Sequence, residues 1–149
     1  NHGYMSGGSI RHPHSQIIGL EDYDYHEDIT AQNMEGWLLH EDQDVRITLS
    51  TQPIIGFFEY NLRYKPDAPV RSIAMRLQQT IRYVLDSLAK FSQSYNYFFY
   101  QLEDGYEYIK VIPRYITTPL YVGYKIPQTC NDERAAKILR NITPYFELK

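Results

Sequence analysis

Cysteine is nearly absent from this chain of 149 residues, which holds only Cys130. A single thiol excludes an internal disulfide and a cysteine-rich metal site, and it fits a reducing compartment. We interpret Cys130 as an ordinary loop or helix-start residue, since no histidine lies near it in the sequence. No apolar run has membrane-spanning length, and no signal peptide is recognisable. These absences predict a soluble, cytoplasmic protein without a membrane partner.

An excess of positive charge is also lacking, because the formal net charge is −3. Domains that bind a nucleic-acid backbone are usually basic. We therefore expect no nucleic-acid partner, and a nucleotide substrate would have to be held by local donors. Tyrosine, in contrast, is abundant, with 15 copies that cluster in strand-like stretches.

The first sixteen residues concentrate groups that can handle a phosphate: Asn1-His-Gly-Tyr-Met-Ser-Gly-Gly-Ser-Ile-Arg-His-Pro-His-Ser-Gln16. Glycines allow backbone amides to approach an anion closely. We predict a strand from about residue 12 to residue 20, in which His12, His14 and Gln16 share one face. This pattern suits attack on phosphorus by a neutral imidazole beside donors that stabilise the developing charge. The alternative is a flexible linker with a chance histidine cluster.

The same sixteen-residue pattern resembles the active-site segment of the galactose-1-phosphate uridylyltransferases, which belong to the histidine-triad (HIT) superfamily. The resemblance implies that His14 forms a covalent nucleotidyl intermediate and that His12 supports it. It also implies that most of one domain precedes the motif, so that this chain is a C-terminal fragment. Residues expected to contact the nucleotide phosphates are Asn1, Gly7, Gly8, Ser9 and Gln16.

Residues 21–36 carry six carboxylates and little periodic apolar signal. We interpret them as a linker or a short capped helix at a domain boundary. Residues 1–36 would end a first HIT-like unit, and residues 37–149 would form a second, C-terminal one. His26 lies among acids that suggest a metal site, but we favour a solvated connector because nothing fixes convergent geometry.

The remaining residues predict an α+β fold, with an antiparallel sheet packed against one long and one short helix. The resemblance implies that this sheet and its helices are HIT-like. Asp67 should cap the long helix, whose apolar face runs from Val70 to Phe91, with Arg76 on its solvated side. Asn131 should cap the short helix. Expected strands are residues 37–42, 45–49, 54–64, 95–100 and 106–112, with a short strand or ordered loop at 119–124.

The second unit departs from the resembled family at two places. Alternating histidines that bind a structural metal in many members are replaced here by Tyr106, Tyr108 and Lys110, so we expect no metal and no cofactor. A substrate loop of the family is matched by Val122 and Tyr124, but its sugar-binding acid is Lys125. Lysine suits a phosphate or carboxylate better than neutral hydroxyls. A solvated surface pair is an equal alternative for Tyr124 and Lys125.

The resemblance predicts a nucleotidyltransferase that uses a nucleotide sugar and a sugar phosphate, and that forms a homodimer. One alternative is a hydrolase or phosphorylase of nucleotides or dinucleoside polyphosphates that uses the same histidine. Another is a nucleotide-binding module without turnover, which the replaced histidines and the altered loop favour.

Overall fold

The computed structural model describes residues 1–7, 12, 14–19, 21–88, 90, 93–115 and 117–147. The strands of this described part are β1 (Gly36–Glu41), β2 (Val45–Ser50), β3 (Tyr60–Tyr64), β4 (Ser94–Gln101) and β5 (Glu107–Arg114). The helices are α1 (Ala31–Met34), α2 (Val70–Ser87), α3 (Pro119–Tyr124) and α4 (Asp132–Phe146). Two short 3-10 turns, η1 (Tyr4–Ser6) and η2 (Tyr25–Glu27), precede them.

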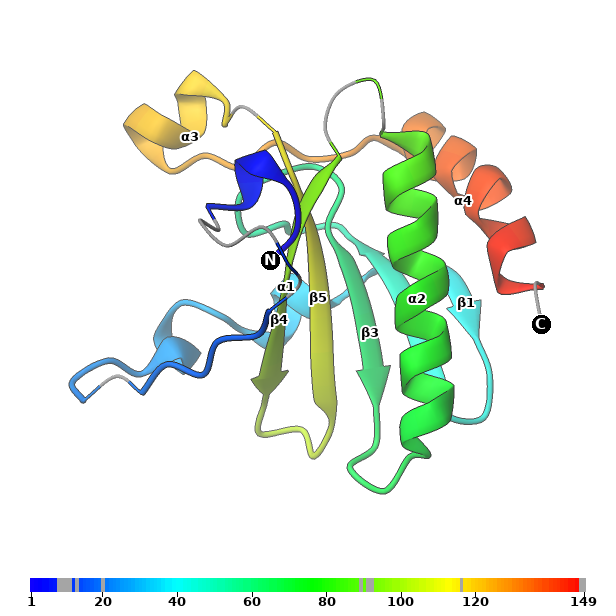
Figure 1. The fold of residues 1–149 in the computed structure, drawn as a ribbon. Coiled ribbons are helices and arrows are strands. Elements are labelled where there is room, and N and C mark those ends of the chain that lie inside the picture. The colour runs from blue at the N-terminus through cyan, green and yellow to red at the C-terminus, as the bar shows by residue number, and fades with distance from the viewer. Residues whose placement is uncertain are drawn as a thin grey trace.

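The strands form one antiparallel sheet in the order β1-β2-β3-β5-β4. Helices α2 and α4 pack against one face, which we call the covered face (Figure 1). The short α1 lies on the opposite face, which neither α2 nor α4 covers and which we call the open face (Figure 1). This arrangement confirms the predicted α+β class.

Strict alternation along the strands builds the core on the covered face. Side chains two apart in a strand point the same way, so every second residue is placed under the helices. The completely or almost completely buried strand residues of this core are Val45, Ile47, Leu49, Tyr60, Leu62, Ile109 and Val111. The alternating pattern predicted for 45–49 is thus confirmed.

The long strand predicted for residues 54–64 is wrong in its first half. The carboxylate of Glu59 accepts hydrogen bonds from the backbone amides of Ile54, Ile55 and Gly56 at 2.7, 2.8 and 2.9 Å. These bonds curl the chain around one side chain, and amides used in this way are not available to a sheet ladder. Strand β3 therefore begins only at Tyr60.

Three predictions for the helical regions need correction: the start and the end of the long helix, and the structure of residues 119–124. Pro69, rather than Asp67, occupies the position before α2, and that helix ends at Ser87 instead of continuing toward residue 91. Residues 119–124 form a helix rather than a strand or loop. The hydroxyl of Thr118 accepts a hydrogen bond from the Leu120 amide at 3.2 Å, and Pro119 takes the first helical position, where its missing N–H costs nothing.

The predicted cap of the last helix is confirmed, since the Asn131 side chain accepts a hydrogen bond from the Arg134 amide at 3.0 Å. Cys130 directly precedes this cap and is buried, as expected of an ordinary helix-start residue. Burial raises the pKa of its thiol, which disfavours the reactive thiolate.

Arg76 is not solvated as predicted, because only 12 % of its side chain is exposed. Its guanidinium donates to the carboxylate of Asp42 at 2.8 Å and to the carbonyl of Phe146 at 3.0 Å. The arginine thereby joins α2 to the turn after β1 and to the end of α4. Charged groups with several fixed acceptors are tolerated at such partly buried positions.

The acidic segment is mostly exposed, as a solvated connector would be, but a few hydrogen bonds attach it to the sheet. The His26 ring lies 2.6 Å from the Asp24 carboxylate and 2.9 Å from the Gln101 carbonyl, and the Tyr25 hydroxyl donates to that carbonyl at 2.8 Å. These contacts attach η2 to the end of β4. The predicted domain boundary at residue 36 stays a prediction.

The described residues contain no cluster of three histidine, cysteine or acidic side chains arranged for a metal. Among the described helices, none has the length and apolarity to cross a membrane.

Candidate functional site

The N-terminal segment lies along the outer edge of β4. The backbone amide of His2 donates to the Tyr95 carbonyl at 2.9 Å, and the Tyr95 amide donates back to His2 at 3.0 Å. Gly3 follows with a positive φ of 78°, and a Cβ there would collide with Ser94 and with the Gln93 carbonyl. Only glycine fits this approach of the motif to the strand.

His14 is held by its own chain rather than by a strand. The predicted strand from residue 12 to residue 20 is wrong for the described residues 14–19, which have no regular secondary structure. The His14 Nδ1 atom lies 3.1 Å from the His12 carbonyl oxygen. Because a carbonyl can only accept, Nδ1 carries the proton in this contact, and in the neutral imidazole Nε2 keeps its lone pair.

The side chains of His12 and His14 do not act as a parallel pair. Their ring centroids are 6.5 Å apart with an interplanar angle of 75°, and His12 is exposed to solvent. The expected shared face is therefore not formed. The hydrogen bond between His12 and the expected nucleophile uses the His12 main-chain carbonyl as acceptor, and the two rings approach each other edge-on.

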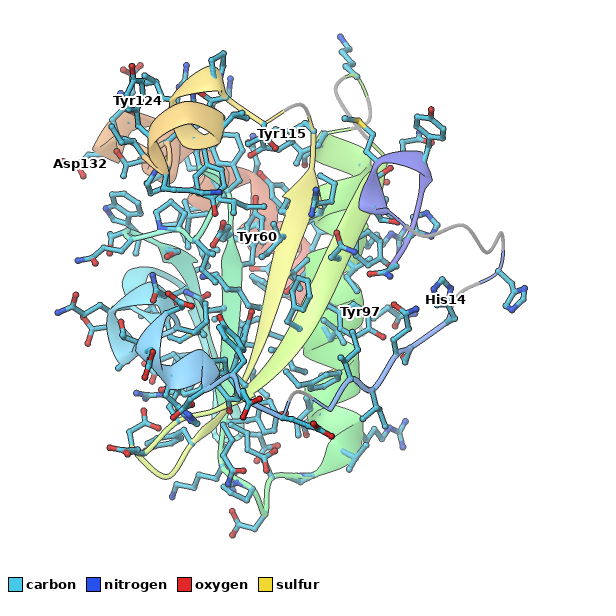
Figure 2. The ribbon with its side chains drawn as sticks, turned by 90° about the vertical axis from the view of Figure 1, so that its left-hand side faces the viewer. His14, Tyr60, Tyr97, Tyr115, Tyr124 and Asp132 are labelled. Atoms are coloured by element: carbon cyan, nitrogen blue, oxygen red, sulfur yellow. The ribbon has the colours of Figure 1, made fainter. Side chains whose placement is uncertain are left out.

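A pocket of about 240 Å³ includes His14. Figure 2 shows His14 beside Tyr97 at the edge of the sheet. The rings of His2, Tyr95 and Tyr97 form a stack with centroid separations of 5.1 and 6.4 Å. The residues lining this pocket, which we call the His14 pocket, are Asn1, His2, His14, Ser15, Tyr95 and Tyr97.

Amide side chains connect the head of the motif to the sheet. Asn96 donates to the Asn1 side-chain oxygen and, at 3.0 Å, to the Ser6 carbonyl. Arg114 donates to the Asn96 oxygen at 3.3 Å, which fixes the orientation of that amide. The Asn1 amide in turn lies 3.5 Å from Gln16, so two residues predicted to bind phosphate do approach each other.

A family model supplies the first relationship to known proteins. It describes the C-terminal domain of DUF4931, a domain of unknown function, and it matches residues 26–146. The chain belongs to the DUF4931 family. It is also similar to the crystal structure of a DUF4931 family protein from Bacillus cereus ATCC 10987, with 37 % identity and a TM-score of 0.81. That alignment covers 99 % of this chain and 66 % of the solved one.

The chain thus spans just under two-thirds of the length of that solved relative. No curated protein matches it. The family description names no activity, and the resemblance to the uridylyltransferases stays a prediction.

The structure of this DUF4931 domain does not bring every predicted phosphate-binding residue to the His14 pocket. Gly7 ends η1 with a φ of 77°, is exposed, and does not line the pocket. Gly8 and Ser9 lie outside the described residues. Their predicted contacts with phosphate remain predictions.

The predicted substrate loop is also separate from the His14 pocket. Val122 and Tyr124 are 67 % and 75 % exposed on α3, and Lys125 extends over the ring of Tyr121 at 5.3 Å. Figure 2 shows Tyr124 near one end of the sheet, well away from His14. Within one chain, these residues do not share a pocket with His14.

Two aromatic walls of the pocket, Tyr95 and Tyr97, were not among the predicted site residues. The alternation in residues 95–100 places these two tyrosines on one face and Asn96 on the other. That signal was present in the sequence. What the sequence did not indicate is that residue 2 pairs with residue 95, which brings the motif onto these side chains.

Proposed function

We propose that this protein transfers nucleotidyl groups through His14, as its resemblance to the uridylyltransferases of the HIT superfamily implies. The observation that carries this proposal is the 3.1 Å contact between the His14 Nδ1 atom and the His12 carbonyl. A tautomer with its proton on Nδ1 has a nucleophilic Nε2 without any need for a separate base.

In the first step, the Nε2 lone pair attacks the α-phosphorus of a nucleotide sugar. An N–P bond forms, and the P–O bond to the sugar phosphate breaks, so the sugar phosphate departs with the bonding electrons. In the second step, a phosphate oxygen of another sugar phosphate attacks the same phosphorus. The N–P bond then breaks and its electron pair returns to Nε2.

The surroundings of His14 support this assignment. Asn1 lines the pocket and has an amide that can donate to a phosphoryl oxygen, and Gln16 accepts from that amide at 3.5 Å. Tyr95 and Tyr97 offer aromatic faces on which a nucleobase can stack. A volume of about 240 Å³ suits part of a nucleotide rather than the whole substrate, since complete small-molecule sites span roughly 300–1,000 Å³.

The exposed α3 supports a role for a second subunit. Val122 and Tyr124 match a family loop that reaches a neighbouring subunit's site, and Lys125 stands where that loop has a sugar-binding acid. None of the three lines the His14 pocket of its own chain. In a homodimer, Lys125 would hold a phosphate or carboxylate of the acceptor. Light scattering that gives a monomer at working concentration would remove this part of the proposal.

The proposal is tested by intact-protein mass spectrometry after mixing the protein with a panel of nucleotide sugars and quenching at alkaline pH. Phosphoramidates on histidine survive base and break down in acid. We expect a nucleotidyl-sized mass gain that disappears in His14→Ala. His12→Ala should keep the adduct, because the contact with His14 uses the His12 main chain.

His26→Ala is the matched control, since that histidine lies at the other end of β4. An adduct that persists in His14→Ala would refute the assignment of the nucleophile. Product release in buffer without an acceptor would identify the alternative hydrolase. Saturable nucleotide binding with no adduct and no turnover would identify a binding module instead.

A further inference from the structure

A second pocket, with a volume of about 530 Å³, lies on the open face of the sheet. It lies between α1 and the middle strands, and it shares no lining residue with the His14 pocket. Its size falls in the range of roughly 300–1,000 Å³ that is typical of small-molecule sites. Its charged lining residues are two arginines and two acids, Arg46, Arg63, Glu35 and Asp104, with Thr48 and Tyr108 beside them.

Two arginines face each other across neighbouring strands in this pocket. Arg46 of β2 is paired directly with Arg63 of β3. Like charges at directly opposite positions of an antiparallel sheet are destabilising. Such a pair on the wall of a pocket indicates a site where an anion would relieve the repulsion.

Only one of the two arginines has a carboxylate partner among the described residues. Arg46 donates to the Glu41 carboxylate at 3.1 Å. Arg63 has no hydrogen bond or ion pair with any described residue. Its guanidinium instead lies 4.4 Å from the centroid of the Tyr106 ring. This cation–π contact orients the planar group while leaving its N–H donors available.

Neighbouring polar groups are already engaged with each other. The Asp104 carboxylate accepts hydrogen bonds from the Tyr106 amide at 3.1 Å and from the Tyr108 hydroxyl. Burial and the bond to Asp104 raise the pKa of Tyr108, so its hydroxyl remains a protonated donor to that acid. The Thr48 hydroxyl donates to the Met34 carbonyl at 3.1 Å. The Asp104 carboxylate thus accepts hydrogen bonds from Tyr106 and Tyr108, and it forms no ion pair with Arg63.

We propose that this pocket binds a small molecule through a phosphate or carboxylate group, which Arg63 grips through two parallel N–H donors with Arg46 alongside. A guanidinium matches either anion in a bidentate geometry. The remaining volume would hold the body of the ligand against α1. This site is independent of the transfer reaction proposed for His14.

The test is isothermal titration calorimetry at low salt with inorganic pyrophosphate and, separately, citrate. The two probes distinguish a phosphate site from a carboxylate site. We expect Arg63→Gln to raise the Kd of the preferred probe about tenfold or more, which corresponds to the loss of one charge-assisted contact. Arg63→Lys, which keeps the charge but loses the fork, should give an intermediate Kd.

Arg71→Gln is the matched control, because Arg71 is an exposed arginine on α2 at the covered face. This variant and His14→Ala should each leave the Kd unchanged. An equal loss of affinity in Arg71→Gln would show a general charge effect and would overturn the proposal. So would unchanged affinity in Arg63→Gln, or the absence of saturable binding of both probes to the wild-type protein.

Discussion

The two faces of the sheet use the same strands for different purposes. On the covered face, Ile47, Leu62 and Val111 are completely buried by apolar contacts with the helices. On the open face, their neighbours Arg46, Arg63 and Lys110 carry charge. Adjacent residues of one strand thus differ completely in environment, because side chains alternate between the faces.

The comparison teaches that charge on the open face is handled in two ways. Lys110 is completely buried and fully paired, whereas Arg63 borders a pocket and lacks a carboxylate partner among the described residues. The first arrangement supports the fold. The second is available for a ligand. Mutations that separate these two uses are the sharpest test of the comparison.

The largest effect is expected at Lys110. Its Nζ atom donates to the Asn33 carbonyl and the Asn61 side chain at 2.7 Å each, and lies 3.1 Å from the Glu59 carboxylate. Burial lowers the pKa of Lys110, while the charge of Glu59 opposes that shift. Lys110→Met leaves the buried carboxylate unpaired and should lower the free energy of unfolding by about 3–5 kcal/mol.

Chemical denaturation measures this loss, and Lys65→Met is the control because Lys65 is exposed. That variant should stay within about 0.5 kcal/mol of wild type. If both lysine variants lost an equally small amount of unfolding free energy, the buried pair of Lys110 and Glu59 would not stabilise the open face. Glu59→Leu combined with Lys110→Met should cost less than the sum of the single changes, because the two groups contact each other.

A smaller, pH-dependent effect on stability is expected at Asp42, which connects the turn after β1 to α2 through Arg76. Partial burial would raise the pKa of Asp42, but hydrogen bonds from the Val45 and Asp44 amides, from His40 and from Arg76 lower it to about 2. A lowered folded-state pKa gives stability that is complete above the unfolded pKa. That stability is lost as the pH falls from about 4 toward 2.

The loss over this interval should reach about 2 kcal/mol in the wild-type protein, since one pKa unit corresponds to about 1.4 kcal/mol. Asp42→Asn should flatten this part of the stability curve, because asparagine does not titrate. Urea denaturation at a series of pH values from 5 to 2 makes the comparison. Equal slopes for the two proteins in the acid range would contradict the role of Asp42.

Local signals in the sequence predicted much of the covered face. The alternation of residues 45–49 and the apolar spacing of the long helix are properties of neighbouring residues, and the Asn131 cap acts within one turn. Each of these depends on contacts close in sequence. The elements they predict are present in the structure.

Contacts between distant residues were not predictable in the same way. Arg76 looks like a surface residue until Asp42, 34 positions earlier, is placed beside it. The strand predicted to begin at residue 54 begins only at Tyr60, because the Glu59 carboxylate accepts hydrogen bonds from three amides and also contacts Lys110. At the candidate site, His14 lines a pocket, and its predicted role as the nucleophile stays a prediction. Its tyrosine walls depend on the pairing of His2 with Tyr95.

The smallest effect on stability is expected for Arg46. Its ion pair with Glu41 is of the same kind as the ion pair of Arg76 with Asp42. The Arg46 and Glu41 side chains are 38 % and 45 % exposed, against 12 % and 28 % for Arg76 and Asp42. Exposed ion pairs contribute roughly 0–1 kcal/mol, because water screens them and both side chains lose entropy. Arg46→Gln should therefore change the free energy of unfolding by no more than about 0.5 kcal/mol.

The change in the free energy of unfolding caused by Arg46→Gln should be even smaller than exposure alone implies. The substitution also relieves the repulsion with Arg63 on the neighbouring strand. Arg76→Gln has no such relief, and it leaves the Phe146 carbonyl and Asp42 without their donor. Thermal unfolding of the two variants side by side measures the difference. A loss in Arg46→Gln as large as that in Arg76→Gln would mean that the open-face arginines stabilise the fold, and their availability to an anionic ligand would then need another explanation.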